Sequence, residues 1–170
     1  MAIYTKISRN DIISIEQKFN LGKIISFKGI KKGIENTNYL IRTKNNKYIL
    51  TIFEKRVQKK DLPFFMSLMD KLNNYKINCP KPQKSKKGNY LVNIKNKPAS
   101  IVSFVEGKEK NKLKIQDCYE IGKNIAKLHM ASKKIKLYRK NSMSLSSWSN
   151  LLNKIGNKSN KIDVNLNDLM

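Results

Sequence analysis

Apolar residues near the start of the chain recur at the spacing of a helix that is buried along one face. Ile12, Ile15 and Phe19 would lie on the same side of such a helix. Ser8 precedes them, and Asp11 follows Ser8 by three residues, so the two side chains can cap the free backbone amides of a first helical turn. The pattern therefore predicts a helix that begins directly after Ser8.

Segments rich in β-branched and aromatic residues come next, separated by runs of Gly, Pro, Asn and Lys. This alternation is typical of strands joined by turns. Five strands are predicted, at residues 23–28, 38–43, 48–54, 90–94 and 99–105. The segment 99–105 is almost wholly apolar, which favours a position inside the sheet.

Helical spacing returns after the third predicted strand. A helix is expected to begin at Asp61, with Pro63 tolerated in its first turn. Its buried stripe is predicted at Phe65, Leu68, Met69 and Leu72. Three later helices are predicted, over residues 116–132, from Ser144 onward, and at 165–170. Helices and strands in this order indicate an α+β fold.

The chain is strongly basic, with 36 Lys and Arg against 12 Asp and Glu and a formal charge of +24. Such a charge first suggests nucleic acid or an anionic membrane surface as a partner. A nucleic-acid surface, however, gathers Lys and Arg on one face with aromatic residues between them. Here Lys is scattered along the chain beside Asn and Ile. We therefore interpret the charge mainly as compositional and expect no nucleic-acid partner, although a basic surface that attracts phosphorylated small molecules stays open.

Membrane and metal chemistry find little support in the sequence. No apolar run approaches the ~18 residues that a membrane-spanning helix needs, and the first residues lack the apolar stretch of a signal peptide. Cys79 and Cys118 are too few for a disulfide framework and are not spaced as zinc ligands. We expect a soluble, cytoplasmic protein without a membrane partner.

The loop at residues 29–37 is the clearest candidate for chemistry. It lies between two predicted antiparallel strands, and Gly29 and Gly33 would let its backbone approach a ligand closely. Several phosphotransferases cover nucleotide phosphates with such a strand-loop-strand unit. The segment contains neither G-x-x-x-x-G-K-[ST] nor G-x-G-x-x-G. On residue chemistry alone, a flexible hairpin loop remains the alternative.

The other polar residues do not assemble into a catalytic set. His129 is the only histidine and is interpreted as structural. Glu54, Asp61 and Asp70 are single acids near the ends of elements, where capping or solvent-facing roles are expected, with Asp61 as a helix N-cap. Trp148 is interpreted as a packing residue. Residue chemistry alone thus indicates an α+β domain followed by a helical segment.

Several segments taken together are distinctive: residues 2–6 (AIYTK), 33–39 (GIENTNY), 48–56 (YILTIFEKR) and 61–65 (DLPFF). They resemble the bacterial homoserine kinases of the type built on the aminoglycoside phosphotransferase and choline kinase fold. Two further segments are similar to the wider superfamily only, 101–107 (IVSFVEG) and 121–129 (IGKNIAKLH). The resemblance covers residues 1–150 and fades in the Asn/Lys/Ser-rich end.

The resemblance implies a two-lobed, protein-kinase-like fold. Residues 1–105 would form an N-terminal nucleotide-binding lobe with a five-stranded antiparallel sheet and a helix, and residues 106–170 would begin a helical C-terminal lobe. The loop would lie over the phosphates of ATP, and a hinge would hold adenine through its backbone. The implied ATP-binding residues are Gly29, Gly33, Ile34, Glu35, Asn36, Asn38, Thr51 and the hinge residues Ser103, Phe104 and Val105.

The chain departs from the superfamily pattern in two places. Thr51 stands where many relatives carry a phosphate-binding Lys, and Lys55 or Lys32 could supply the positive charge instead. A catalytic loop of the form H-x-D-x-x-x-x-N and a later metal-binding Asp do not occur in the sequence, so no catalytic residue and no metal ligand is assigned. We expect the chain to stop before both, and to be inactive alone, whereas the intact enzyme would use ATP with Mg²⁺.

The resemblance implies ATP-dependent phosphorylation of the hydroxyl of L-homoserine, a step of threonine biosynthesis. Two alternatives stay open. One is another small-molecule kinase of the same fold, with choline, methylthioribose or an aminoglycoside as acceptor. The other is a non-catalytic basic module that binds nucleic acid.

Overall fold

A computed structural model describes residues 3–55 and 57–162, with only the backbone described at Asn157. The helices, strands and 3₁₀ turns (η) are α1 (Arg9–Lys18), β1 (Ile24–Gly29), β2 (Thr37–Thr43), β3 (Lys47–Ile52), η1 (Lys59–Asp61), α2 (Leu62–Asn74), β4 (Leu91–Ile94), β5 (Lys97–Ser103), α3 (Ile115–Ser132), α4 (Leu145–Ile155) and η2 (Gly156–Lys161). The predicted helix at 165–170 lies outside the described residues. Within the described part of the chain, no helix has both the length and the apolar character needed to cross a bilayer.

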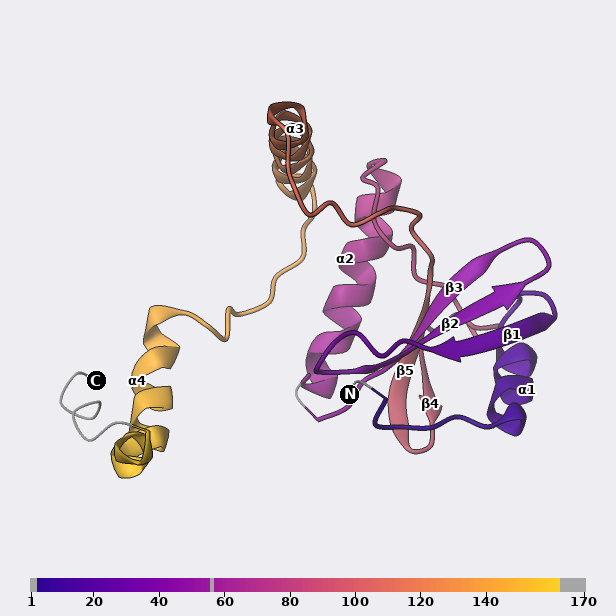
Figure 1. Ribbon diagram of the computed structural model, residues 1–170, viewed down its shortest axis with the longest axis horizontal. Coiled ribbons are helices and arrows are strands. Elements are labelled where there is room, and N and C mark those ends of the chain that lie inside the picture. Colours follow the sequence, from indigo (N-terminus) through magenta and orange to yellow (C-terminus); the bar gives the residue numbers. More distant parts are fainter. Residues whose placement is uncertain (1–2, 56, 163–170) are drawn as a thin grey trace. The chain divides into compact units, whose positions relative to one another are not determined.

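The five strands form one antiparallel sheet in the order β1-β2-β3-β5-β4 (Figure 1). This confirms the predicted five-stranded sheet, with the apolar β5 between two other strands. β5 begins earlier than predicted, because Lys95 and Asn96 both have positive φ, 50° and 61°, and form a tight two-residue turn. It also ends earlier, so Phe104 and Val105 lie outside the strand.

One face of the sheet carries the main apolar core. Alternate residues of β2, among them Tyr39 and Ile41, are buried on this face. The predicted apolar positions of α1, Ile12, Ile15 and Phe19, are all buried against them. Full burial of one such side chain stabilises the fold by roughly 1.5–3 kcal/mol, so this helix and the sheet hold each other in place.

The second apolar cluster forms where α2 packs beside β4. Leu62 and Met66 of α2 are buried and pack with Phe53 and Leu91. Leu91 pairs with Ser100, while its neighbour Val92 packs into the main core, so α2 lies against the face of the sheet opposite to α1.

The predicted stripe of α2 needs correction. Leu72 is buried as expected, but Phe65, Leu68 and Met69 are only half-buried. Leu62 and Met66 are the buried helix residues of the second cluster, and Phe65 and Met69 pack against it while partly exposed.

Three apolar residues of helix α3 lie on one face at the spacing that the sequence predicts. Ile121, Ile125 and Leu128 keep 48%, 48% and 36% of their surface exposed. Together with Leu72 and Ile77 they help to line a cavity of about 750 Å³ between α3, the end of α2 and the linker that follows β5. No residue assigned to ATP binding from the sequence lines this cavity.

The described residues divide into two compact units, the first ending at Leu137 and the second beginning at Tyr138. The predicted division at residue 105 stays a prediction. Helix α4 of the second unit begins after Ser144, as expected. Trp148 lies on this helix with 51% of its surface exposed, so it is not a core residue among the described residues, and its interpretation as a residue that packs between lobes stays a prediction.

Candidate functional site

The candidate site is built around the loop between β1 and β2. Its first residue is held to the sheet by a hydrogen bond from the Ile30 amide to the Asn38 carbonyl, with an N···O distance of 2.8 Å. Gly33 has φ of 111°, a conformation that strains any residue with a Cβ atom. Ile34 and Glu35 are exposed at the tip, and Asn36 is half-buried. The loop therefore projects from the sheet and is fastened at its ends.

Gly29 also has a packing role, and its predicted part in ATP binding stays a prediction. A Cβ atom at this position would press against the end of the Ile3 side chain and approach Tyr39 Cε1 at 3.4 Å. Both neighbours belong to, or pack against, the main core. The absence of a side chain at Gly29 thus makes room for Ile3, and Gly33 is the glycine that the loop's own conformation requires.

Asn38 and Thr51 lie side by side on the face of the sheet opposite to the main core. They are register partners in β2 and β3, and the Thr51 hydroxyl donates to Asn38 Oδ1 at 2.8 Å. This bond leaves the two N–H donors of the Asn38 amide without a partner among the described residues, available to an acceptor such as a phosphate oxygen. Thr51 is thus part of a neutral hydrogen-bonded pair.

The predicted hinge follows directly on β5. The Ser103 amide donates to the Lys81 carbonyl at 2.9 Å, and the Phe104 amide donates to the Lys47 carbonyl at 3.1 Å. Among the described residues, the amide of Val105 has no hydrogen-bond partner. The Lys47 ammonium lies 5.5 Å from the centre of the Phe104 ring. The hinge is thus held by backbone hydrogen bonds to two different segments, at Lys81 and Lys47. Its Val105 amide is left available to donate to a ligand.

Two exposed ion pairs link the predicted nucleotide-binding segments to the linker after the hinge. Lys32 in the loop pairs with Glu109 at 2.7 Å, and Lys47 of β3 pairs with Glu106 at 2.6 Å. Pairs this exposed contribute little to stability. The Lys32–Glu109 pair nevertheless places the loop and the linker within reach of each other, as a shared nucleotide cleft requires.

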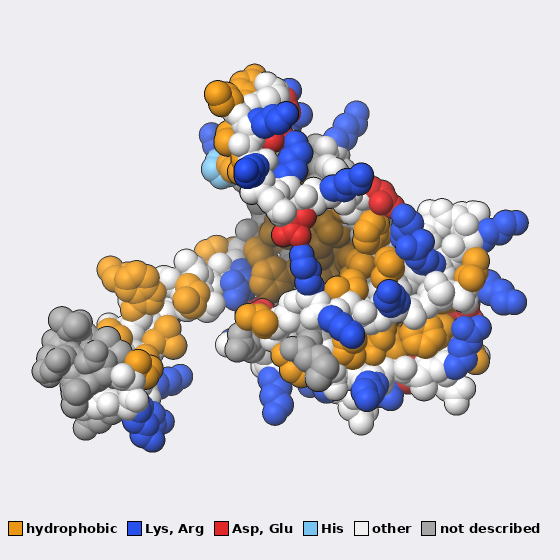
Figure 2. Space-filling view, viewed as in Figure 1, with side chains coloured by type: hydrophobic (Ala, Val, Ile, Leu, Met, Phe, Trp, Pro, Cys, Tyr) orange, Lys and Arg blue, Asp and Glu red, His pale blue; other side chains and the backbone are white. Residues whose placement is uncertain are grey.

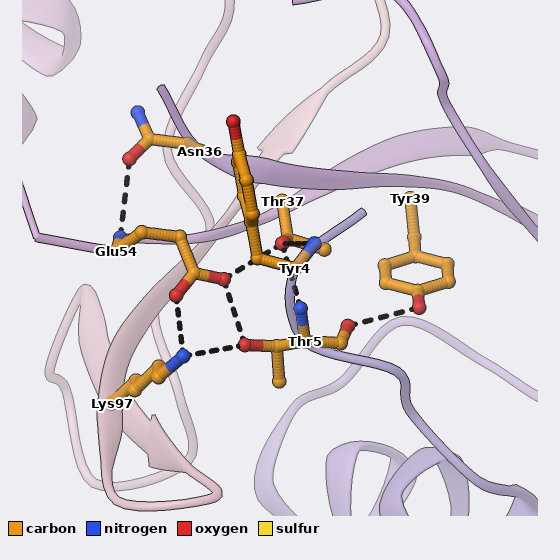
Figure 3. Close-up of polar contacts among 7 residues, drawn as sticks. All are labelled: Tyr4, Thr5, Asn36, Thr37, Tyr39, Glu54 and Lys97. Atoms are coloured by element: carbon orange, nitrogen blue, oxygen red, sulfur yellow. Dashed lines mark hydrogen bonds and ion pairs between the residues drawn. The ribbon is translucent and has the colours of Figure 1, made fainter. Parts of the chain in front are cut away.

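Behind the loop, the carboxylate of Glu54 collects polar groups from distant segments (Figure 3). Its Oε1 accepts hydrogen bonds from the hydroxyls of Thr5 and Thr37, each at 2.7 Å. Its Oε2 forms an ion pair with Lys97, whose ammonium also donates to the Thr5 hydroxyl at 2.8 Å. Only 8% of the Glu54 side chain is exposed, against 40% for Lys97.

The environment of Glu54 favours its ionised form. Burial alone would raise the pKa of this carboxyl, because desolvation disfavours the charge. The hydrogen bonds from Lys97, Thr5 and Thr37 outweigh burial, and the pKa of Glu54 lies below its ordinary value. A carboxylate at this depth therefore stays charged at neutral pH.

Sequence reasoning missed this cluster. Glu54 was expected to cap an element or face solvent, whereas the structure buries it. Local patterns could not reveal the cluster, because its partners lie 17, 43 and 49 residues from Glu54 along the chain. Its members Thr5, Thr37 and Glu54 do fall within the segments that carry the family resemblance, and that was the one available signal.

Among the described residues, no three His, Cys, Asp or Glu side chains lie close enough to hold a metal ion. His129 is exposed on α3. Lys55, one of the two lysines considered for phosphate binding, is exposed just after β3.

The chain is similar to several curated homoserine kinases. That of Methylocella silvestris is 37% identical over 166 residues, which are 98% of this chain and 52% of the relative. Those of a Bradyrhizobium species and of Rhizobium rhizogenes are 34% and 36% identical, over 100% and 99% of this chain and 53% and 52% of the relatives. The chain thus spans about half the length of the curated relatives it matches.

Two solved structures share the fold. A spectinomycin phosphotransferase, determined with ADP and spectinomycin, aligns with a TM-score of 0.63 and 13% identity over 91% of this chain and 48% of that protein. An amicoumacin kinase, determined with AMP-PNP and Ca²⁺, aligns with a TM-score of 0.61 and 15% identity over 78% of this chain and 42% of that protein. The sheet and its helices therefore have a fold that resembles the kinase-like N-terminal lobe of such proteins.

A family model draws these likenesses together. The model of the phosphotransferase enzyme family matches residues 26–158, a stretch that includes the loop, most of the sheet, the hinge and α3. On this evidence the chain belongs to the phosphotransferase enzyme family.

Proposed function

We propose that this chain is the nucleotide-binding part of a homoserine kinase, which transfers the γ-phosphate of ATP to the side-chain hydroxyl of L-homoserine. The observation that carries the proposal is the identity of 34–37% to proteins named homoserine kinase along nearly the whole chain. The chain spans about half the length of those relatives, so we propose this reaction for the whole protein and nucleotide binding for this chain.

The arrangement of the loop and hinge supports ATP as the phosphate donor. Phosphoryl transfer depends on positioning the nucleotide and on neutralising the charge of its phosphates. The loop from Ile30 to Asn36 would cover the phosphates, and the Asn38 amide would donate to one of their oxygens. The open amide of Val105 would donate to the adenine ring.

The positive charge that Thr51 does not provide has a candidate source in Lys32. Its ammonium is mobile enough to exchange Glu109 for a phosphate, because both side chains are largely exposed. Kinases take ATP as its Mg²⁺ complex. We assign no Mg²⁺ ligand and no catalytic base to this chain, since its described residues hold no suitable acidic cluster.

The test is an assay of ATP-dependent phosphorylation with the complete natural polypeptide, run in parallel with the 170-residue chain. We expect the complete polypeptide to form phosphohomoserine, and the 170-residue chain to bind ATP weakly and to form none. Homoserine is compared with choline, methylthioribose and an aminoglycoside. Preference for one of these other acceptors would overturn homoserine as the substrate. Formation of phosphohomoserine by the 170-residue chain would overturn the proposal that the catalytic residues lie outside this chain.

A pair of hinge variants tests the nucleotide site itself. Val105→Pro removes the open amide donor, whereas Val105→Ala keeps it. We expect Val105→Pro to raise the KM for ATP about tenfold, the effect of losing roughly 1.4 kcal/mol of binding, and to leave the KM for homoserine unchanged. Val105→Ala should behave as the unmodified protein. Equal KM values for ATP in both variants would contradict the proposed adenine contact.

A further inference from the structure

The Glu54 carboxylate joins four segments that are far apart in the sequence. Thr5 comes from the segment before α1, Thr37 from the start of β2, Glu54 itself from the end of β3, and Lys97 from the start of β5. No role of this carboxylate follows from the function proposed above. Its position next to the end of the loop suggests one.

Four hydrogen bonds fasten the last part of the loop to this cluster and to the neighbouring residue Tyr4. The Thr37 hydroxyl donates to Glu54 Oε1, and the Glu54 backbone amide donates to Asn36 Oδ1 at 3.3 Å. The Tyr4 hydroxyl donates to the Ile34 carbonyl at 2.9 Å, and the Tyr4 amide donates to the Thr37 hydroxyl at 2.9 Å. Each contact ends on the cluster or on the segment that the cluster holds.

The cluster acts from the side of the sheet that faces away from the candidate nucleotide site. Thr37 lies on the same face of β2 as the core residues Tyr39 and Ile41, whereas Asn38 lies on the other face. Glu54 therefore cannot be a direct nucleotide ligand in this geometry. Its effect on a ligand would pass through the backbone of the loop.

From these contacts we propose that Glu54, ion-paired with Lys97, is a positioning residue that fixes the conformation of loop residues 33–36 over the nucleotide phosphates. The statement that the loop lies over the nucleotide phosphates rests on the proposed function. The effect on the loop does not, because it is a property of the free protein.

The first experiment measures the backbone order parameters of residues 33–36 by ¹⁵N relaxation in the 170-residue chain. We expect ordered values in the unmodified chain and a fall below about 0.6 in Glu54→Gln, because glutamine carries no charge and cannot form the ion pair with the Lys97 ammonium. Amides of Leu50 and Ile101, deep in the sheet, should keep their values. Glu106→Gln, which removes the exposed partner of Lys47, is the matched control and should leave the loop unchanged.

A second set of variants keeps the test decisive if Glu54→Gln does not fold. Lys97→Met should loosen the loop, whereas Lys97→Arg retains the ion pair and should not. Thr37→Val removes the bridging hydroxyl and should loosen the loop, whereas Thr37→Ser retains it. An ordered loop in both Lys97→Met and Thr37→Val, or equal loosening of the loop and the sheet core, would overturn the proposal.

Kinetics of the complete natural polypeptide separate positioning from a merely structural role. Lys97→Met is expected to raise the KM for ATP about tenfold with little change in the KM for homoserine, and Lys97→Arg to restore it. Equal changes in both KM values would contradict positioning. A complete polypeptide that does not use ATP would refute the proposed function, while the order parameters would still decide the effect on the loop.

Discussion

Thr37 illustrates how one buried hydroxyl can join three segments of a chain. It is fully buried, donates its single hydrogen to Glu54, and accepts hydrogen bonds from the amides of Tyr4 and Thr5. All three bonding positions of the hydroxyl are therefore used. A residue of the same shape without the hydroxyl would leave two amides and a carboxylate short of partners, which is costly at this depth.

The ionisation of Glu54 gives a prediction for the pH dependence of stability. The pKa of Glu54 is lower in the folded than in the unfolded chain, so its contribution is fully present above the unfolded value and is lost as pH falls through the folded value. Glu54→Gln should lower the free energy of unfolding by about 1–2 kcal/mol at neutral pH, a moderate figure because Lys97 is 40% exposed and partly screened.

Urea unfolding followed by circular dichroism, at pH values from neutral to about 3, measures this difference. The difference in the free energy of unfolding between the unmodified chain and Glu54→Gln should become smaller as the pH falls, because the carboxylate of Glu54 becomes protonated. Asp11, whose pKa is also lowered, is present in both proteins and cancels in the comparison. A difference that stays constant over this range would show that the charge of Glu54 does not stabilise the fold.

At the residue scale, the sequence predicted local roles well and distant ones poorly. The capping of α1 by Ser8 and Asp11 depends on residues three apart and was predicted correctly. The roles of Glu54 and Gly29 depend on residues such as Thr5 and Ile3, which reach them only through the folded sheet. The ATP-binding residues named from the family resemblance stay predictions.

At the scale of elements, α1 shows how a start signal and an apolar stripe together define a helix. The Ser8 amide donates to Asp11 Oδ2 at 2.7 Å, and the Asp11 amide donates to the Ser8 hydroxyl at 3.3 Å. This reciprocal pair forms the capping box that the sequence predicts. The Ser8 backbone bond is also the largest cause of the lowered pKa of Asp11.

Removal of this cap should weaken α1 and, through it, the sheet. Ser8→Ala is expected to lower the free energy of unfolding by about 1 kcal/mol, measured by urea unfolding at neutral pH. Ser14→Ala is the matched control, because the same substitution in the middle of the same helix introduces a better helix former and should be neutral or slightly stabilising. Equal losses in the two variants would show that the capping bonds contribute nothing specific.

The order of the strands shows where pattern reasoning stops. Turn residues predict that β2 pairs with β3, and β4 with β5, because each pair is joined by a short turn. They do not predict that β5 pairs with β3, across α2, to complete the sheet. The family resemblance implied a single five-stranded antiparallel sheet, but not this pairing.

At the scale of the whole molecule, the proposed function does not explain the net charge of +24. On the face drawn in Figure 2, Lys and Arg side chains are dispersed among apolar and uncharged polar ones. Such a surface differs from the continuous basic groove that follows a nucleic-acid backbone. This distribution supports the compositional interpretation of the charge.

The charge nevertheless leads to a measurable expectation. The chain should bind a labelled DNA duplex only weakly, and binding measured by fluorescence anisotropy should vanish between about 50 mM and about 200 mM salt without sequence preference. Binding that stays tight at the higher salt concentration would favour the nucleic-acid module instead. A polylysine peptide of similar charge serves as the reference for purely electrostatic binding.

The close packing of Ile3 over Gly29 limits which pairs of side chains homologous sequences can carry at these two positions. The two positions share one small volume, so a larger side chain at residue 29 must be matched by a smaller one at residue 3. Gly29→Ala should therefore be tolerated better alongside Ile3→Val than by itself. In a broad alignment of homologous chains, side-chain sizes at these two positions should be anticorrelated, a covariation signal that comes from shape and owes nothing to ligand chemistry.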